Sequence, residues 1–186
     1  MKRNISVYRM VIAALLVAVG ILIPMTFPKI TIPPMSFTLA SHVAIFLACF
    51  ISPITAAAVA VGTTIGFALT LPLPVVLRAA SHIVWALVGA LWLRKKHSLL
   101  TDTPGCVLFC TVIGLIHAAG EVLVLMPLYF GNMLTSAVYE SGFFTYIILL
   151  VGLGTFLHSS VDFIISLAVW KALRRLPIIR DITPVR

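Results

Sequence analysis

Six runs of apolar residues constrain this chain more than any other feature. They lie at roughly residues 7–27, 37–51, 54–71, 75–93, 106–130 and 143–170. A helix needs about 20 apolar residues to cross the hydrocarbon core of a bilayer. Only 10% of the residues are charged, whereas a soluble domain usually has about 25%. The sequence therefore predicts an all-α integral membrane bundle of six transmembrane helices, in a single domain over residues 1–186.

The connections between the runs differ in character. Only Ser52 and Pro53 separate the second and third runs. Proline removes a backbone donor and disfavours helix at the residue before it, so we expect a tight hairpin between two short helices. The loop at 28–36 is rich in proline and apolar residues, and the loop at 131–142 contains glycine and a glutamate. These two loops are either lids over a cavity or plain connectors.

The basic residues indicate how the helices are oriented. Eleven of the thirteen Lys and Arg residues fall on one side of the predicted bundle: Lys2, Arg3, Arg9, Arg94, Lys95, Lys96, Lys171, Arg174, Arg175, Arg180 and Arg186. Cytoplasmic segments carry the excess of Lys and Arg, so both termini are predicted to be cytoplasmic, in a bacterial inner membrane. This placement also favours membrane orientation over nucleic-acid binding as the reason for the net charge of +8.

Seven ionisable residues lie inside the apolar runs, where such groups are costly and rarely face lipid. They are His42, Arg78, His82, His117, Glu121, His158 and Asp162. Six of them form three pairs at a spacing of four residues, which places both side chains of a pair on one helix face. Four of the seven are expected at a similar depth in the outer part of the membrane: His42, Arg78, His82 and Glu121. The sequence therefore predicts a polar pocket that opens outward.

Arg78 is the most informative of these residues, because a guanidinium stays charged and needs an anion in an apolar pocket. That anion is either Glu121, which would make the pair structural, or a bound acidic or carbonyl-bearing small molecule. The two roles can coexist. His42 and His82 are candidates for ligand contact as much as for structural hydrogen bonding.

The remaining polar and aromatic residues have a structural alternative. His117 and His158 are expected to form hydrogen bonds within the bundle, and Asp162 is expected to pair with His158 and hold helices together. Trp85 and Tyr146 either line the pocket or belong to the aromatic belt at the membrane interface.

The motifs that the chain lacks argue against catalysis. It contains no GxxxxGK[ST], HExxH or GxSxG pattern, so neither nucleotide hydrolysis nor the obvious intramembrane hydrolysis is expected. Cys106 and Cys110 are read as small apolar residues, and neither a metal nor a cofactor is expected. In the first run, Ala14 and Ala18 form a small-xxx-small face that would let another helix approach closely.

These features together resemble the substrate-binding S components of energy-coupling factor (ECF) vitamin transporters. The resemblance rests on six spans in about 20 kDa, the alanine face, the apolar 28–36 loop and the outward pocket. The stretches SFTLASHVAIFLA (36–48) and LRAASHI (77–83) are most similar to members of the niacin type.

The resemblance implies a high-affinity vitamin-capturing subunit that is not an enzyme. Such a subunit docks through its first three helices, with Ala14 and Ala18 included, onto a membrane scaffold that carries two ATPases. Arg78 would hold the carboxylate of niacin, and His82 or His42 would contact its ring nitrogen. Niacin is favoured over pantothenate or a pyrimidine precursor.

Two further functions stay open from the residues alone. In a self-contained secondary transporter of a small organic anion, a chain of groups would relay protons: His117, Glu121, His158 and Asp162. In an intramembrane enzyme, Ser–His or His–carboxylate groups would hydrolyse a substrate or hold a metal.

Overall fold

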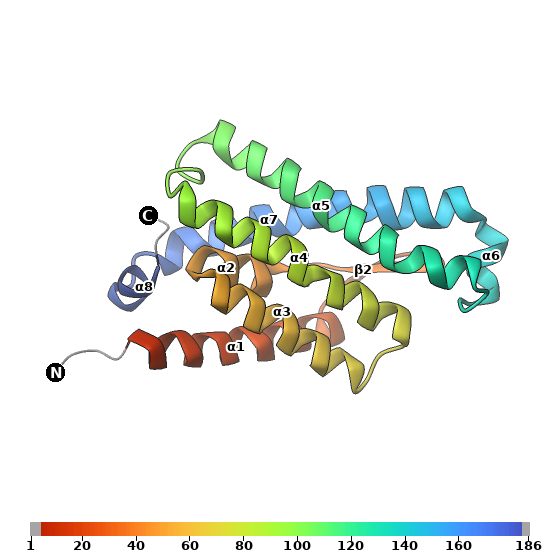
Figure 1. The fold of residues 1–186 in the computed structure, drawn as a ribbon, viewed down its shortest axis with the longest axis horizontal. Coiled ribbons are helices and arrows are strands. Elements are labelled where there is room, and N and C mark those ends of the chain that lie inside the picture. The colour runs from red at the N-terminus through yellow and green to blue at the C-terminus, as the bar shows by residue number, and fades with distance from the viewer. Residues whose placement is uncertain (1–4, 184–186) are drawn as a thin grey trace.

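The computed structural model describes residues 5–183, and helices dominate it (Figure 1). Its elements in chain order are α1 (Ile5–Thr26), β1 (Lys29–Ile32), β2 (Met35–Thr38), α2 (Val43–Ile51), α3 (Pro53–Ala68), α4 (Leu73–Lys95), α5 (Thr103–Phe130), α6 (Ser136–Ser141), η1 (Phe144–Leu153), α7 (Gly154–Leu173) and α8 (Pro177–Ile182). The π-helical segment η1 runs directly into α7. The prediction of an all-α membrane bundle is confirmed, with one small β-hairpin added.

Four helical segments within residues 5–183 are long and apolar enough to cross a membrane. They are α1, α4, α5 and the continuous stretch formed by η1 and α7. The shorter helix α3 has 16 residues and is also apolar. These five segments coincide with five of the six predicted runs.

The second predicted run, 37–51, is wrong as a continuous helix. Phe37 and Thr38 belong to strand β2, which pairs antiparallel with β1 and faces Ile30 and Lys29 across the hairpin. Helix α2 covers only nine residues, and all nine are buried. A buried helix does not need the length of a lipid-facing span. A short apolar run is equally compatible with a strand or a buried helix, so periodicity could not separate the two.

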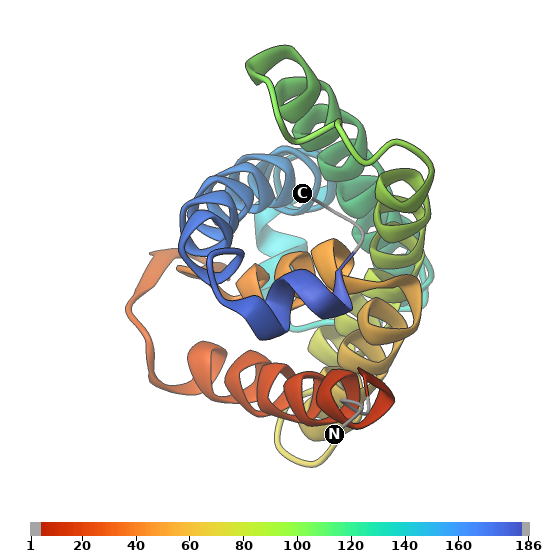
Figure 2. The ribbon, with the colours of Figure 1, turned by 90° about the vertical axis from the view of Figure 1, so that its left-hand side faces the viewer.

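Helix α2 lies in the middle of the bundle, as the end-on view shows (Figure 2). It contacts α1, α3, α4 and α7. The side-chain oxygen of Ser52 accepts a 3.1 Å hydrogen bond from the backbone N–H of Thr55, and Pro53 occupies the first turn of α3. Both are standard ways to start a helix. The predicted hairpin between two short helices at this point is therefore confirmed.

Glycines bring α1 and α3 close together. A Cβ atom on Gly62 would lie 2.6 Å from Cγ2 of Val17, and one on Gly20 would lie equally close to a threonine methyl of α3. Small residues allow such close packing between membrane helices. Ala14 and Ala18 are exposed on another face of α1. That face is therefore not used in the packing of α1 against this chain.

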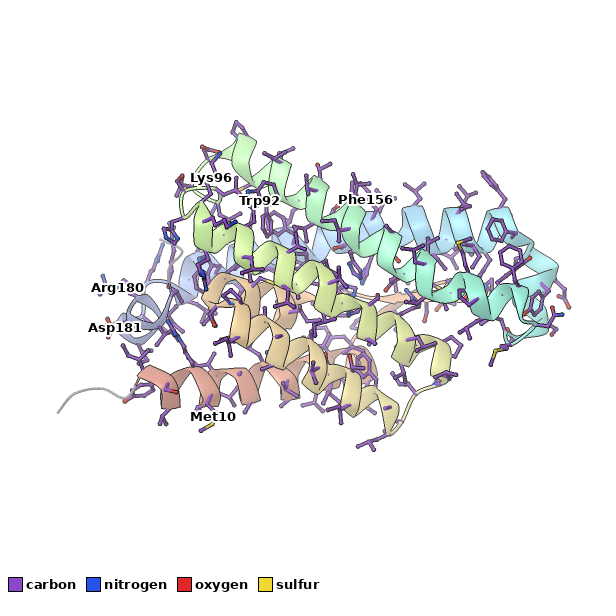
Figure 3. All side chains as sticks on the ribbon, in the orientation of Figure 1. Met10, Trp92, Lys96, Phe156, Arg180 and Asp181 are labelled. Atoms are coloured by element: carbon purple, nitrogen blue, oxygen red, sulfur yellow. The ribbon has the colours of Figure 1, made fainter. Side chains whose placement is uncertain are left out.

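The beginning of α1 and the C-terminal helix α8 meet at one end of the bundle. Nε and Nη2 of Arg9 donate hydrogen bonds of 3.1 and 2.8 Å to the carbonyl oxygen of Ile182. Lys96, at the end of α4, and Arg180 on α8 lie at the same end (Figure 3). Basic side chains from distant parts of the chain therefore share one end of the molecule.

Candidate functional site

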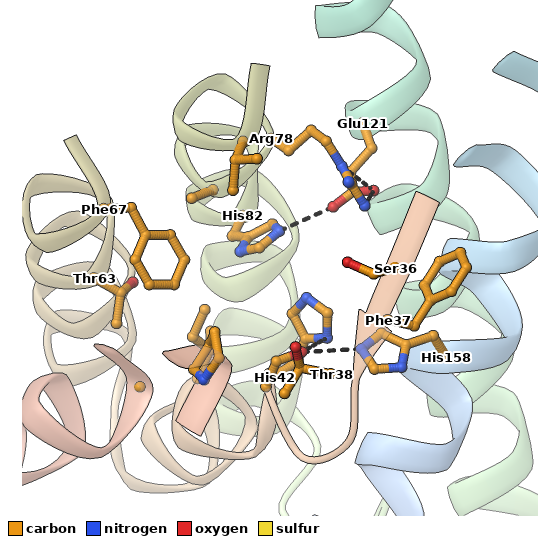
Figure 4. A pocket seen from close by; sticks show the side chains of 16 residues that line it. Ser36, Phe37, Thr38, His42, Thr63, Phe67, Arg78, His82, Glu121 and His158 are labelled. Carbon is orange, nitrogen blue, oxygen red and sulfur yellow. Dashed lines mark hydrogen bonds and ion pairs between the residues drawn. The ribbon is translucent and has the colours of Figure 1, made fainter. Parts of the chain in front are cut away.

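A cavity inside the bundle is the candidate functional site (Figure 4). The space at this site is about 630 Å³ when the open solvent at its mouth is included. Its lining combines polar, aromatic and small side chains: Gly20, Pro24, Ser36, Phe37, Thr38, Ser41, His42, Ile45, Thr63, Phe67, Val75, Arg78, Ala79, His82, Glu121 and His158. Strand β2 and six helices contribute, so the cavity depends on the whole fold.

Arg78 lines the cavity and is also paired with a carboxylate. Its Nε and Nη2 atoms donate to Oε2 of Glu121 at 2.9 and 2.8 Å. Its Nη1 atom is directed to the sulfur of Met35 at 3.6 Å, and a thioether is a weak acceptor. Thr155 donates to the same oxygen of Glu121. Arg78 is therefore held by Glu121 and also borders the cavity, and its role in ligand binding stays a prediction.

Three histidines pack against one another beside this ion pair. The ring centroids of His42 and His82 are 5.0 Å apart, those of His42 and His117 are 4.6 Å apart, and those of His82 and His117 are 4.7 Å apart. Nε2 of His82 lies 3.3 Å from Oε1 of Glu121. All three rings are buried. The structure thus brings His42, His82, Arg78 and Glu121 together, as the helix-depth argument anticipated.

Asp162 has a different main partner from the expected one. It accepts hydrogen bonds from the backbone N–H groups of Ala40 and His42 at 2.7 and 2.9 Å, and its Oδ2 lies 3.0 Å from Nδ1 of His42. The expected partner His158 is farther, at 3.4 Å. Ala40 has a positive φ of 66°. Asp162 on α7 therefore fixes the tight turn that joins β2 to α2, a contact that the spacing of residues did not predict.

His117 and His158 occupy different environments. His117 is fully buried, and its Nδ1 lies 3.1 Å from the hydroxyl of Ser159. His158 lines the cavity, and its Nε2 lies 2.9 Å from the hydroxyl of Ser41. A structural role was expected for both residues, but the position of His158 at the cavity also makes it a candidate for ligand contact.

Trp85 and Tyr146 are not among the residues that line the cavity. Both are buried, so neither belongs to an exposed aromatic belt. Trp85 packs behind the histidines, with its ring centroid 5.0 Å from that of His117 and 6.0 Å from that of His82. Any effect of Trp85 on a ligand would therefore act through these rings.

The aromatic walls of the cavity come from Phe37 on β2 and Phe67 on α3, which sequence reasoning missed. Ser36, Thr38 and Ser41 were also missed as lining residues. Their signal was present in the loop at 28–36 and the residues after it, where prolines precede alternating apolar and polar residues. Reading that segment as a strand would have directed one set of side chains inward.

A bundle of apolar helices around a polar cavity defines a multi-pass membrane protein with an internal candidate binding site, and in bacteria the location of such a protein is the cell membrane. The chain is 39% identical over 175 residues to the niacin transporter NiaX of Lactococcus lactis subsp. cremoris (strain MG1363). The match covers 93% of this chain and 78% of that protein. The chain therefore belongs to the family of niacin-type S components of ECF transporters. No family model matches the chain. No solved structure matches it.

Proposed function

We propose that this chain captures niacin from outside the cell and delivers it to an ECF-type importer, whose partner subunits hydrolyse ATP. The observation that carries the proposal is Arg78, a guanidinium at the wall of an internal cavity, whose Nη1 atom is directed to the weak thioether acceptor of Met35. The relative named a niacin transporter supports the choice of ligand. The chain itself supplies binding and no chemistry.

The cavity offers complementary groups for each part of niacin, a small aromatic carboxylate. Nη1 and Nη2 of Arg78 donate to the vitamin's carboxylate, while Nε keeps its bond to Glu121. The ring lies between Phe37 and Phe67, since aromatic walls suit a flat ligand. The ring nitrogen accepts a hydrogen bond from His42 or His82. Trp85 and Tyr146 keep the binding residues in place from behind.

The orientation of the protein follows from its charged end. The end that holds Arg9, Lys96 and Arg180 faces the cytoplasm, because basic segments stay on that side. Six helical segments, α2 included, then place both termini inside and form a single domain over residues 1–186. Arg78 lies in the first two turns of α4, whose start at Leu73 is at the outer side. The cavity is therefore reached from outside.

The exposed alanine face of α1 docks onto the membrane scaffold subunit, which carries the two ATPases. Ala14 and Ala18 are exposed, whereas Gly20 is buried against α3. Small exposed residues allow a partner helix to approach closely within lipid. The glycine side of α1 thus serves the fold, and the alanine side serves assembly.

A proton-coupled secondary transporter is the alternative, and one observation favours it. The buried imidazoles of His42, His82 and His117 form a continuous cluster between Glu121 and Asp162, and such a chain of groups can relay protons. In proteoliposomes, this alternative requires niacin uptake driven by a proton gradient in the isolated chain. The proposed function requires uptake only with the partner subunits and ATP.

Mass spectrometry of small molecules that co-purify with the detergent-solubilised chain tests the proposal directly. We expect niacin in the wild-type preparation and none in an Arg78→Ala preparation of equal monodispersity. Pantothenate or a pyrimidine in place of niacin would refute the ligand. Equal niacin in both preparations would remove Arg78 from the binding site.

A further inference from the structure

The buried imidazoles beside Glu121 have the composition and spacing of a metal site. One nitrogen from each of His42, His82 and His117 and one oxygen of Glu121 lie within 4.8 Å of one another, and all four residues are buried. Neutral imidazole is the most common metal ligand in proteins, and three nitrogens with one carboxylate oxygen suit Zn²⁺. The proposed niacin contacts use only part of this cluster and give His117 no role in niacin binding.

The distances between Glu121 and the two imidazoles beside it are long for hydrogen bonds and also suit an ion between them. Oε1 of Glu121 lies 3.3 Å from Nε2 of His82 and 3.4 Å from Nε2 of His117. Hydrogen bonds between nitrogen and oxygen are usually about 2.7–3.2 Å long. Around a tetrahedral Zn²⁺ with bonds of about 2.0–2.2 Å, neighbouring ligand atoms are roughly 3.3–3.5 Å apart. The two observed separations therefore match the edges of such a tetrahedron.

His117 supplies an independent observation. Its side chain is 0% exposed, and its Nε2 has no hydrogen-bond partner within residues 5–183, although Oε1 of Glu121 lies 3.4 Å away. A buried polar nitrogen without a partner is costly, because it has lost its hydrogen bonds to water. Ser159 engages the other ring nitrogen of His117, at 3.1 Å. An ion at Nε2 would satisfy the remaining atom.

The groups around the cluster are arranged as supports for metal ligands. Arg78 and Thr155 bind Oε2 of Glu121, which leaves Oε1 to face the histidines. The carboxylate of Asp162 accepts a hydrogen bond from Nδ1 of His42, which leaves the lone pair on Nε2. Carboxylates and hydroxyls that orient a ligating imidazole in this way are typical of protein metal sites.

The charges around the cavity indicate how a bound cation would help to bind an anionic ligand. Apart from the histidines, one guanidinium, Arg78, is set against two buried carboxylates, Glu121 and Asp162. An anionic vitamin would add another negative charge to this site, which is costly in a medium of low polarity. A divalent cation reverses the balance and leaves one positive charge for the carboxylate of the ligand.

We propose that His42, His82, His117 and Glu121 bind Zn²⁺ or a similar divalent transition-metal ion next to the cavity, and that its charge completes the receptor for the anionic vitamin. The metal site rests on the geometry of the cluster alone. Its effect on the vitamin rests on the proposed function.

Zinc titration of the full chain tests the metal site. Detergent-solubilised protein is treated with EDTA, dialysed, and titrated with Zn²⁺ alone. We expect one ion per chain, and binding weaker by more than about tenfold in His117→Ala and in His82→Ala. His97→Ala is the matched control, because His97 is exposed in the loop after α4. The double variant Cys106→Ser/Cys110→Ser is a second control, because thiolates also bind Zn²⁺.

Unchanged Zn²⁺ affinity in both histidine variants, or a loss in His97→Ala alone, would overturn the site. If the histidine variants do not fold, the visible absorption spectrum of Co²⁺ added to the wild-type chain tests the site instead. The intense visible absorption of tetrahedral Co²⁺ supports the site, and the weak spectrum of octahedral Co²⁺ overturns it.

Niacin titrations separate this inference from the proposed function. Zinc-loaded protein should bind niacin more than about tenfold tighter than EDTA-treated protein. Equal affinities would overturn the role of the ion and leave the proposed function intact. Zinc bound through His117 without niacin binding in either form would overturn the proposed function and support the metal site.

Discussion

Replacing Arg78 by lysine is the sharpest single test of the binding site. Lysine keeps the positive charge but presents one nitrogen in place of the planar fork of arginine. In the structure, the fork gives Nε and Nη2 to Glu121 and leaves Nη1 against the thioether of Met35. A single ammonium group at this position cannot serve Glu121 and a ligand carboxylate with equivalent geometry. Arg78→Lys should therefore bind niacin more weakly while the protein still folds.

The size of the effect follows from the bonds that are lost. One hydrogen bond to a charged partner contributes about 1.5–3 kcal/mol. Since each 1.4 kcal/mol corresponds to a factor of ten, niacin affinity should fall by about 10- to 100-fold. Alanine is a poorer choice for this measurement. Removing the guanidinium leaves the buried Glu121 without its cationic partner, which costs about 3–5 kcal/mol of stability, so a loss of folding could not be separated from a loss of binding.

Isothermal titration of niacin into detergent-solubilised protein measures this effect, with thermal unfolding as the check on folding. Arg94→Lys is the matched control, because Arg94 is exposed at the other end of the same helix. The control should bind niacin as the wild type does. An affinity within twofold of wild type in Arg78→Lys would refute the idea that the guanidinium receives the carboxylate.

Three further substitutions test the packing of α1 against α3, the turn between β2 and α2, and assembly with the partner subunits. Gly62→Ala would place a methyl group 2.6 Å from a side-chain atom of α1 and should lower the free energy of unfolding by about 1–3 kcal/mol. In Gly120→Ala the nearest atom lies at 3.5 Å, so thermal unfolding should change little, and equal effects would contradict the packing argument. Asp162→Ala leaves two backbone N–H groups without their acceptor and should speed amide exchange in the turn between β2 and α2; unchanged exchange there would show that Asp162 does not hold the turn. Ala14→Trp should leave niacin binding intact and block uptake with the partner subunits, whereas the lipid-facing control Leu157→Trp should transport normally, and normal uptake by Ala14→Trp would exclude this face from docking.

The bundle was predictable because its signal is local. Each long run carries enough apolar residues to specify a span, and Ser52 with Pro53 specifies the break between α2 and α3. The convergence of Arg78 and Glu121 was predictable for a similar reason. Only a few positions along each helix share the same depth, and buried charges require one another.

The β1–β2 hairpin and the aromatic walls of the cavity were not predictable from apolar runs and helix spacing. The pairing of Lys29 with Thr38 depends on a turn that composition does not reveal, and a run of apolar residues does not distinguish a strand from a buried helix. The partner of Asp162 depends on the turn at Ala40, and no sequence pattern predicted the positive φ of that residue. Long-range contacts of this kind are decided by tertiary packing, which helix periodicity does not encode.

Equilibrium titration of the purified chain with niacin, in detergent and without ATP or any partner, tests the central claim most directly. Capture by this chain alone predicts saturable binding of one niacin per chain. Compounds that lack the carboxylate should not compete with niacin for the site. No binding under these conditions, or equally strong binding of nicotinamide, would contradict a site built around the positive charge of Arg78.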